Sequence, residues 1–553
     1  MVSKDCAIFF EEDAYSINSK KLMGRNSAGA SFLKGYFSNG NPKNFWVYAK
    51  ERNQAQNFAD ILSDNSSRKD AKYISWTNFT ELKEPGNLFF PGPNFNKIAW
   101  QRRFFAENAW SICGITHTTS SATAMDAIGD YYLAPTKSWD ALICTSNAVK
   151  DNVQFILENK KKYLRDEVGL SKFEGPKLPV IPLGINTKEF EFSQNDRFKA
   201  RNKLTIEKNC VVIAYVGRLS FHAKANPIAM YSAIEKAASL NPSKNIKILE
   251  CGWFQNDWIQ NAFVEIEKTV LSKVELIRVD GRDQGNVKMV WQAADIFCSF
   301  SDNIQETFGI SPIEAMASSL PVVVSNWNGY KESVRDGIDG FKISTLMPEG
   351  GLGRDLAISH AMDINNYDHY VGKTSAFISV DIDQATDRFD KLIKSEDLRY
   401  ELGANAKKQA VEKYDWKRII PQYENLWLEL GEERKKSVTQ SQPKAIWPER
   451  SDPFFSFAHY ASSKLNMSDK LKISRHSLDE TIDRFTKLKS IKMSSFITSI
   501  LPNDDEFLQV FESVENNALT VQNLLTKFDK SRQPFVYRSL FWLLKVGLLK
   551  LVK

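Results

Sequence analysis

Two acidic side chains in the second half of the sequence could hold the hydroxyl groups of a sugar. Glu306 and Glu314 have seven residues between them. The first follows an apolar strand and the second lies inside the next predicted helix, so both can face one cleft. A carboxylate accepts hydrogen bonds from paired hydroxyls, as on a ribose or a hexose. The simpler alternative is a solvent-facing glutamate and an ordinary helix glutamate.

The residues between the two glutamates add backbone groups to this chemistry. Thr307, Phe308 and Gly309 lead into the helix. The free N–H groups and the dipole of a helix N-terminus favour a phosphate or a hydroxyl. Gly309 lets a ligand approach the backbone closely. Open α/β sheets bind ligands at the carboxyl ends of their strands, and we expect the ligand there.

Two basic residues follow an earlier strand. That strand ends at Val216, Gly217 forms the turn, and Arg218 and Lys224 lie in the loop. Two cations at this position can clamp a diphosphate and neutralise the charge on a departing nucleotide without a metal. The alternative is a pair of exposed basic residues.

The elements that must position these residues alternate along the chain. Short apolar runs are predicted strands, and helical patterns separate most of them: 7–10, 45–48, 141–145, 211–216, 246–250, 274–279, 296–299 and 321–325. This alternation predicts parallel sheets with crossover helices. The expected fold class is α/β, with two Rossmann-like doubly wound domains and a mostly helical C-terminal extension.

The predicted domain boundaries follow from this pattern. An acceptor-side domain covers residues 1–185, and a donor domain covers residues 186–430. Its closing helix, 414–430, could pack back on the first domain. A polar, proline-containing linker spans 431–455, and the extension spans 456–553.

Composition narrows the function classes. A chain of 553 residues is too long for one hydrophobic core, and its net charge of +6 is too mild to argue for nucleic acid. The six cysteines are scattered without a C-x-x-C pair, which argues against zinc or iron–sulfur sites. No uncharged run is long enough to cross a membrane. We expect a cytoplasmic protein that uses no metal and no other cofactor.

The combination of motifs resembles the GT-B glycosyltransferases of family 4. The resemblance is carried by the two glutamates, the Gly217-Arg218…Lys224 loop, IPLGIN (181–186) and WNGYKESVRDGIDGF (327–341). It covers about three quarters of the chain. It implies a retaining enzyme in which Glu306 contacts the donor sugar, Glu314 binds the nucleotide ribose, and the two cations hold the diphosphate. Asn186 stands where the family usually has aspartate, and the loop from Arg218 to Lys224 looks about one residue longer than usual.

The first half of the chain offers further site residues. Gly24 and Gly29 flank a polar loop that opens a predicted helix, 30–37. By resemblance this loop lies against the donor diphosphate, although a flexible surface loop is an equal alternative. His117 resembles the family's active-site histidine and could equally be a structural hydrogen-bonding residue. Arg282 completes the predicted donor-binding set.

The acceptor is the part that the sequence defines least. Tyr131, Tyr132 and Trp139 could stack on a sugar ring, or they could belong to the core. The acceptor class is therefore left as a saccharide or a lipid-linked sugar.

The C-terminal extension carries its own pattern. Helices are predicted over Ala518–Phe528 and Phe535–Lys545, with Gly547 as a C-cap and a short strand after it. This order resembles a winged-helix module. A packing or dimerisation domain is the leading interpretation, followed by contact with a membrane surface, and nucleic-acid binding is the least favoured.

These observations predict a metal-independent, retaining glycosyltransferase of the hexosyltransferase type. It would move a sugar from a nucleoside-diphosphate-sugar donor to its acceptor, in the synthesis of a surface polysaccharide or glycoconjugate. A GT-B epimerase or phosphorylase is a second hypothesis. A third is an inactive sugar-nucleotide-binding or scaffold protein whose C-terminal module binds a partner.

Overall fold

The computed structural model describes residues 3–15, 24–68, 70–437, 447–474 and 477–552. Its internal contacts divide the chain into two compact units, Met1–Trp447 and Pro448–Lys553. We describe each unit by itself. Within the described residues, no helix is long and apolar enough to cross a bilayer.

The first sheet of the larger unit contains six parallel strands. Its order is β3-β2-β1-β4-β5-β6. The strands are β1 (Ala7–Phe9), β2 (Phe45–Ala49), β3 (Ala71–Ser75), β4 (Asn87–Phe89), β5 (Ser111–Ile115) and β6 (Ala141–Ile143). The helices around them are α1 (Glu12–Tyr15), α2 (Gly24–Asn39), α3 (Arg52–Asn65), α4 (Asn96–Arg102), α5 (Ala122–Gly129) and α6 (Asn147–Asp166).

The strands of this sheet are buried on both faces. Ile8 and Val47 belong to one apolar cluster, while their neighbours Ala7 and Trp46 belong to another. Successive side chains of a strand point to opposite faces, so each face packs against its own layer of helices. This explains why the strands consist of nearly continuous apolar residues.

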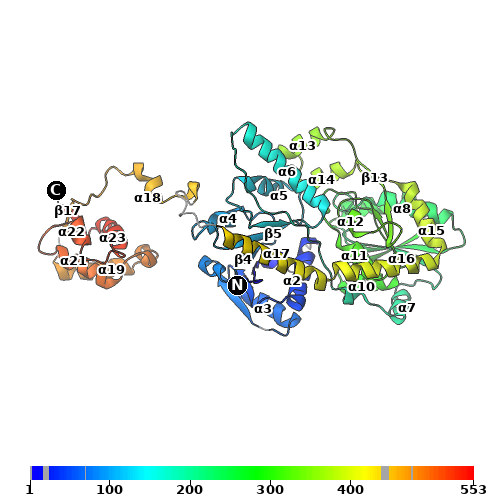
Figure 1. Ribbon diagram of the computed structural model, residues 1–553, viewed down its shortest axis with the longest axis horizontal. Coiled ribbons are helices and arrows are strands. Elements are labelled where there is room, and N and C mark those ends of the chain that lie inside the picture. Colours follow the sequence, from blue (N-terminus) through cyan, green and yellow to red (C-terminus); the bar gives the residue numbers. More distant parts are fainter. Residues whose placement is uncertain (1–2, 16–23, 69, 438–446, 475–476, 553) are drawn as a thin grey trace. The chain divides into compact units, whose positions relative to one another are not determined.

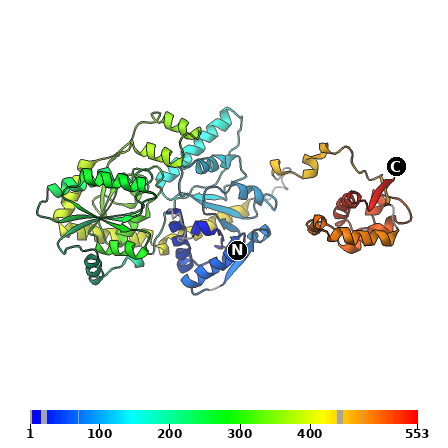
Figure 2. The ribbon, with the colours of Figure 1, turned by 180° about the vertical axis from the view of Figure 1, so that it is seen from behind.

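The second sheet repeats the arrangement. Its order is β12-β11-β10-β7-β8-β9. The strands are β7 (Val211–Val216), β8 (Ile246–Gly252), β9 (Glu275–Asp280), β10 (Ile296–Ser299), β11 (Val322–Ser325) and β12 (Gly340–Ile343). The helices of this half are α7 (Gln194–Lys203), α8 (Pro227–Ser239), α9 (Asp257–Val270), α10 (Gln284–Ala293), α11 (Ile310–Ala317), α12 (Tyr330–Ser333), α15 (Ile382–Lys394) and α16 (Glu396–Gln409). Figure 2 shows helices on both sides of this green sheet.

Both sheets therefore have the same doubly wound order. Counted from its own first strand, each reads 3-2-1-4-5-6, and the direction of winding reverses between strands 1 and 4. In the second sheet these strands are β7 and β10, which pair in parallel. Ligands of such sheets bind beyond the carboxyl ends of the strands at this reversal. The structure confirms the predicted α/β class with two Rossmann-like sheets.

The chain crosses between the two halves twice. The first crossing runs through Ile185, and the second leads into α17 (Trp416–Lys436). Figure 1 shows the yellow α17 among the blue elements of the first sheet. The Trp416 indole N–H donates to the Ser31 hydroxyl at 2.9 Å, and the Trp427 ring packs against Tyr36. The helix continues to Lys436, into residues that the sequence assigned to a linker.

Several elements differ from the sequence prediction. β4 has only three residues, and β3 contains the polar residues Lys72 and Ser75, so neither forms a clear apolar run. The second helix begins at Gly24 rather than at residue 30, which places both predicted loop glycines inside it.

The smaller unit is built around a three-stranded antiparallel sheet of order β16-β15-β17. The strands are β15 (Lys470–Ile473), β16 (Leu519–Thr520) and β17 (Leu549–Val552). Its helices are α18 (Pro453–Ser456), α19 (Leu478–Ser490), α20 (Lys492–Ser495), α21 (Asp504–Val514), α22 (Val521–Leu525) and α23 (Gln533–Lys545). Gly547 follows α23 with a φ of 72°, as a C-cap requires. The helical character is confirmed, whereas the middle strand, β15, was missed because it has only four residues and is defined by its pairing with β16 and β17, much later in the chain.

Candidate functional site

A cleft of about 1550 Å³ lies between the two halves of the larger unit and gathers most of the predicted site residues. Residues from both halves line the cleft, and the carboxyl ends of β7 and β10 lie at its wall. Nine of the predicted residues line it: Gly24, His117, Gly217, Arg218, Lys224, Glu306, Thr307, Gly309 and Glu314. The two acids and two cations thus share one crevice.

Two loops bring the acid and the cation at the centre of the cleft together. Lys224 Nζ lies 3.0 Å from Glu306 Oε2. The loop after β7 and the loop after β10 are bonded to each other, since the Asn303 side-chain amide donates to the His222 carbonyl at 2.7 Å. The Ser301 hydroxyl donates to the Lys224 carbonyl at 3.4 Å. The adjacent ends of β7 and β10 therefore set the distance between Lys224 and Glu306.

Glu306 is held in its ionised form. Burial by itself raises the pKa of this carboxyl, but the Lys224 ammonium and the backbone N–H groups of Thr307 and Phe308 outweigh it, so the net shift is downward. The Thr307 N–H donates to Glu306 Oε1 at 3.3 Å. A carboxylate held in this way is an acceptor for sugar hydroxyls rather than a proton donor.

Glu314 differs from Glu306 in its protonation. Burial, and after it the charge of Glu189, raise the pKa of Glu314 to about 7. The carboxyl group lies on α11 and lines the cleft, and no cation of the described residues offsets its desolvation. A ligand that offers hydroxyl donors would supply that compensation.

The N-terminus of α11 depends on glycine. Gly309 has a φ of 82°, and a Cβ added to it would lie 2.0 Å from the Tyr330 ring. No other residue fits this turn without moving the ring or straining the backbone. The close approach lets the turn after Glu306 pass directly into the helix.

His117 lies in the loop between β5 and α5, on the opposite side of the cleft. The Thr307 hydroxyl donates to the His117 carbonyl at 3.4 Å, and the Ser146 hydroxyl donates to the Thr307 carbonyl at 2.8 Å. His117 thus contacts the loop that carries Glu306. His117 also lines the cleft.

Three predicted donor-binding residues do not line the cleft. Phe308 is buried and packs on the ring of Tyr414, with ring centres 5.8 Å apart. Gly29 faces Ala14 instead, where a Cβ would approach the carbonyl to 2.2 Å. Arg282 is exposed and forms a bidentate pair with Asp280, whereas the neighbouring Gly281 does line the cleft.

The aromatic residues proposed to stack on the acceptor sugar do not line the cleft. Tyr131 is fully buried, and its ring stacks on Phe95 with centres 4.9 Å apart. Neither Tyr132 nor Trp139 lines the cleft. The core alternative is therefore correct for Tyr131, and stacking on a sugar in the cleft is excluded for all three in this arrangement.

The sequence prediction missed several lining residues. Trp253 follows β8 and Gly281 follows β9, so the rule that ligands bind at strand ends could have found both. Tyr367 and Asp368 begin a helix outside the sheet order. No sequence pattern used above points to these two residues.

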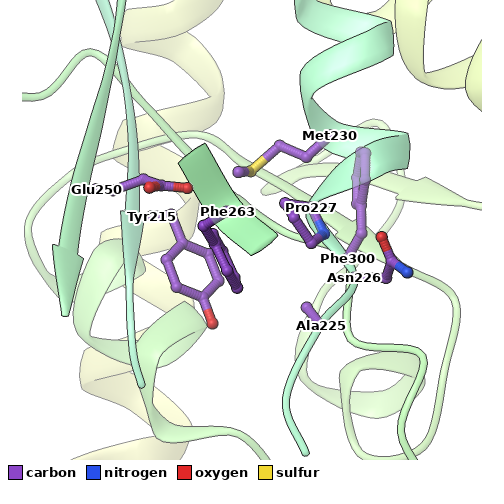
Figure 3. Close-up of a pocket in the computed structure, with 8 residues that line it drawn as sticks. All are labelled: Tyr215, Ala225, Asn226, Pro227, Met230, Glu250, Phe263 and Phe300. Carbon is purple, nitrogen blue, oxygen red and sulfur yellow. The ribbon is translucent and has the colours of Figure 1, made fainter. Parts of the chain in front are cut away.

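A second pocket lies behind the basic loop, and Figure 3 shows its lining. Its volume of about 10 Å³ is too small for a sugar. The lining residues come from β7, the end of the loop after it, α8, β8, α9 and the start of the loop after β10: Tyr215, Ala225, Asn226, Pro227, Met230, Glu250, Phe263 and Phe300. The Tyr215 hydroxyl bonds to the Arg218 carbonyl at 3.2 Å, so this packing supports the loop.

Among the described residues, no three histidine, cysteine, aspartate or glutamate side chains lie close enough together to hold a metal ion. Arg218 and Lys224 are two cationic side chains that line the cleft.

One segment of the chain matches a described family. Residues 196–347 match the model of the glycosyl transferases group 1. The match contains β7 to β12 with both glutamates and both cations. The part of the chain that holds these four residues is therefore similar to the group 1 glycosyl transferases.

Individual relatives agree with this class. The chain is 25% identical over 260 residues to a D-inositol 3-phosphate glycosyltransferase of Mycolicibacterium vanbaalenii, covering 44% of this chain and 53% of that protein. It is 24% identical over 336 residues to an uncharacterized glycosyltransferase of Methanocaldococcus jannaschii, covering 59% and 73%. The chain thus spans about half the length of the first of these relatives.

Solved structures that resemble the chain share less sequence identity with it than these relatives do. The HepE protein of Anabaena in complex with UDP has a TM-score of 0.49 at 14% identity, covering 76% of this chain and 98% of that one. Sucrose-phosphate synthase from Thermosynechococcus elongatus has a TM-score of 0.46 at 14% identity, covering 77% and 98%. Similarity of this size carries no argument about function.

Proposed function

We propose that the protein is a retaining glycosyltransferase that moves a sugar from a nucleoside-diphosphate donor to a saccharide or lipid-linked acceptor. The observation that carries the proposal is the Lys224–Glu306 pair, at 3.0 Å, in a cleft that Arg218 and Glu314 also line. A nucleotide sugar offers a ribose, a diphosphate and a sugar in a row. The four side chains supply hydrogen-bond acceptors for the hydroxyl groups and cations for the diphosphate.

Each side chain has a proposed role. Glu314 accepts hydrogen bonds from the ribose hydroxyls, and Glu306 accepts them from the donor sugar. Arg218 and Lys224 bind the diphosphate, with the N–H groups before α11 adding positive potential. Lys224 would then exchange part of its contact with Glu306 for a phosphate oxygen, which balances both charges.

The reaction that this arrangement supports needs no proton donor from Glu306. The bond between the anomeric carbon and the phosphate oxygen breaks while the acceptor oxygen attacks from the same face. The acceptor proton goes to the departing phosphate oxygen. The protein positions the two substrates and stabilises the charge on the diphosphate, so we propose that no metal takes part.

Removing one acid and one cation tests the proposal. Glu306→Ala and Arg218→Ala should each lower the release of nucleoside diphosphate about 100-fold, the size expected when one preorganised charge-stabilising group is lost. The measurement is nucleotide release from UDP-glucose, UDP-N-acetylglucosamine, GDP-mannose and ADP-glucose, with water or added glycosides as acceptor.

Matched controls come from α6. Glu158→Ala and Arg165→Ala remove exposed side chains of the same two types outside the cleft and should leave the rate unchanged. If both cleft variants turn over donor as fast as the wild type, the assignment is wrong. If the wild type binds a donor but releases no nucleotide with any acceptor, the chain is a sugar-nucleotide-binding protein instead.

A further inference from the structure

An inserted helical hairpin reaches from the second sheet toward the cleft. It leaves after β12 and contains β13 (Thr345–Leu346), α13 (Arg354–Ala361), α14 (Tyr367–Ser375) and β14 (Ser379–Val380). β13 pairs antiparallel with β14, so the hairpin begins and ends at one place. The hairpin is therefore an insertion that is not part of the six-stranded sheet.

The first residue of α14 crosses to the other half of the larger unit. The Tyr367 hydroxyl lies 3.1 Å from the Ser120 hydroxyl and 3.3 Å from the Thr118 hydroxyl. The hydroxyls of Thr118 and Ser120 are 2.9 Å apart, so the three groups form a closed triangle. The Asn366 side chain caps α14 by accepting from the His369 N–H at 2.9 Å, which fixes the start of the helix.

The residues that Tyr367 holds belong to the loop that carries His117. This loop is anchored at its start, where the Thr116 N–H donates to the Ile143 carbonyl at 3.0 Å, and at its end, where Ser121 caps α5. Between these anchors, Thr307 and Tyr367 of the second half form hydrogen bonds with the loop. The position of the loop therefore depends on the hairpin.

The chemistry of the Tyr367 hydroxyl suits this role. Burial raises its pKa, and the hydrogen bonds with Ser120 and Thr118 oppose this only in part, so it stays protonated at neutral pH. Each of the three hydroxyls can donate one proton and accept another, which satisfies the triangle without a charge.

We propose that Tyr367 is a positioning residue that holds the His117 loop in place for sugar transfer. The inference rests on the function proposed above. Tyr367 acts through the loop rather than on the reacting atoms, and the hairpin that supplies it links the donor half of the cleft to the opposite wall.

Tyr367→Phe tests this inference because it keeps the ring and removes only the hydroxyl. We expect kcat for nucleotide release to fall about tenfold, since small displacements in an active site cost this much or more. KM for the nucleotide sugar should change less than about twofold, because the donor-binding groups stay in place. Hydrogen exchange of the 116–121 amides should speed up, with the melting temperature unchanged.

Two further variants make the result specific. Thr118→Val combined with Ser120→Ala should reproduce the loss, and adding Tyr367→Phe to that pair should cause no further loss. Tyr370→Phe, on the same helix but outside the cleft, should behave as the wild type.

The outcomes separate this inference from the proposed function. Wild-type kcat and wild-type exchange in Tyr367→Phe would overturn the positioning role, as would an equal loss in Tyr370→Phe. If the wild type releases no nucleotide from any of the four nucleotide sugars, the proposed function fails. In that case the exchange rates still decide whether Tyr367 holds the loop.

Discussion

Replacing Glu314 with glutamine isolates the carboxyl group of the cleft whose pKa lies near neutrality. Burial, and after it the charge of Glu189, raise this pKa to about 7 in the ligand-free protein. Only the ionised form accepts hydrogen bonds with both oxygens, so a bound ribose lowers the pKa again. Donor affinity should therefore be full above pH 7 and should fall as the pH drops through 7.

The size of the effect follows from the pKa. The ratio of protonated to ionised carboxyl is about 10 at pH 6 and about 0.1 at pH 8, so the apparent affinity falls about tenfold, or about 1.4 kcal/mol. At pH 7, binding should release about half a proton, because about half of the free protein carries one there.

Titration calorimetry with a nucleotide sugar at pH 6, 7 and 8 measures both quantities. A nucleotide sugar is preferable to a free nucleotide, because its two phosphates take up no proton in this range. Repeating the pH 7 titration in two buffers with different ionisation enthalpies gives the proton release. Equal wild-type affinity at pH 6 and pH 8 would refute the reasoning, as would the same tenfold loss in Glu314→Gln.

Three further substitutions test the turn before α11 and a buried ion pair in the first half of the larger unit. Gly309→Ala should destabilise the protein by about 1–3 kcal/mol and abolish turnover, because the new methyl group meets the Tyr330 ring and the backbone has a positive φ. Gly337→Ala, with a φ of 72° and open space around it, should cost less and keep turnover, as thermal unfolding and nucleotide release would show. Arg102→Ala should cost about 3–5 kcal/mol in denaturant unfolding, because it leaves the fully buried Asp140 carboxylate, now 2.6 Å from Arg102, without its cation. A loss under about 1 kcal/mol would contradict this account.

The sequence predicted the second sheet better than the first. β7 and β10 have the predicted bounds because both are uninterrupted apolar runs that end at a turn. β4 was not predicted, since it is short, begins with the polar Asn87 and is defined by its pairing with β1 and β5. Tertiary contacts rather than local preference define such strands.

The candidate site shows the same limit. Residues at strand ends, such as Arg218 and Glu306, were predicted because their place in the sequence fixes their place in the sheet. Phe308 was assigned to the donor by its position in a motif, but its side chain turns into the core. Tyr367 could not be found, because its role depends on a contact with residues about 250 positions earlier in the chain.

The two crossings between the halves of the larger unit meet at one place. The Ile185 N–H donates to the Tyr414 carbonyl at 2.9 Å, and the Trp416 N–H donates to the Ile185 carbonyl at 3.0 Å. These two hydrogen bonds thus join the crossings at one point. Any opening of the cleft would swing about this point, so the walls farthest from it, not those beside it, would travel the greatest distance.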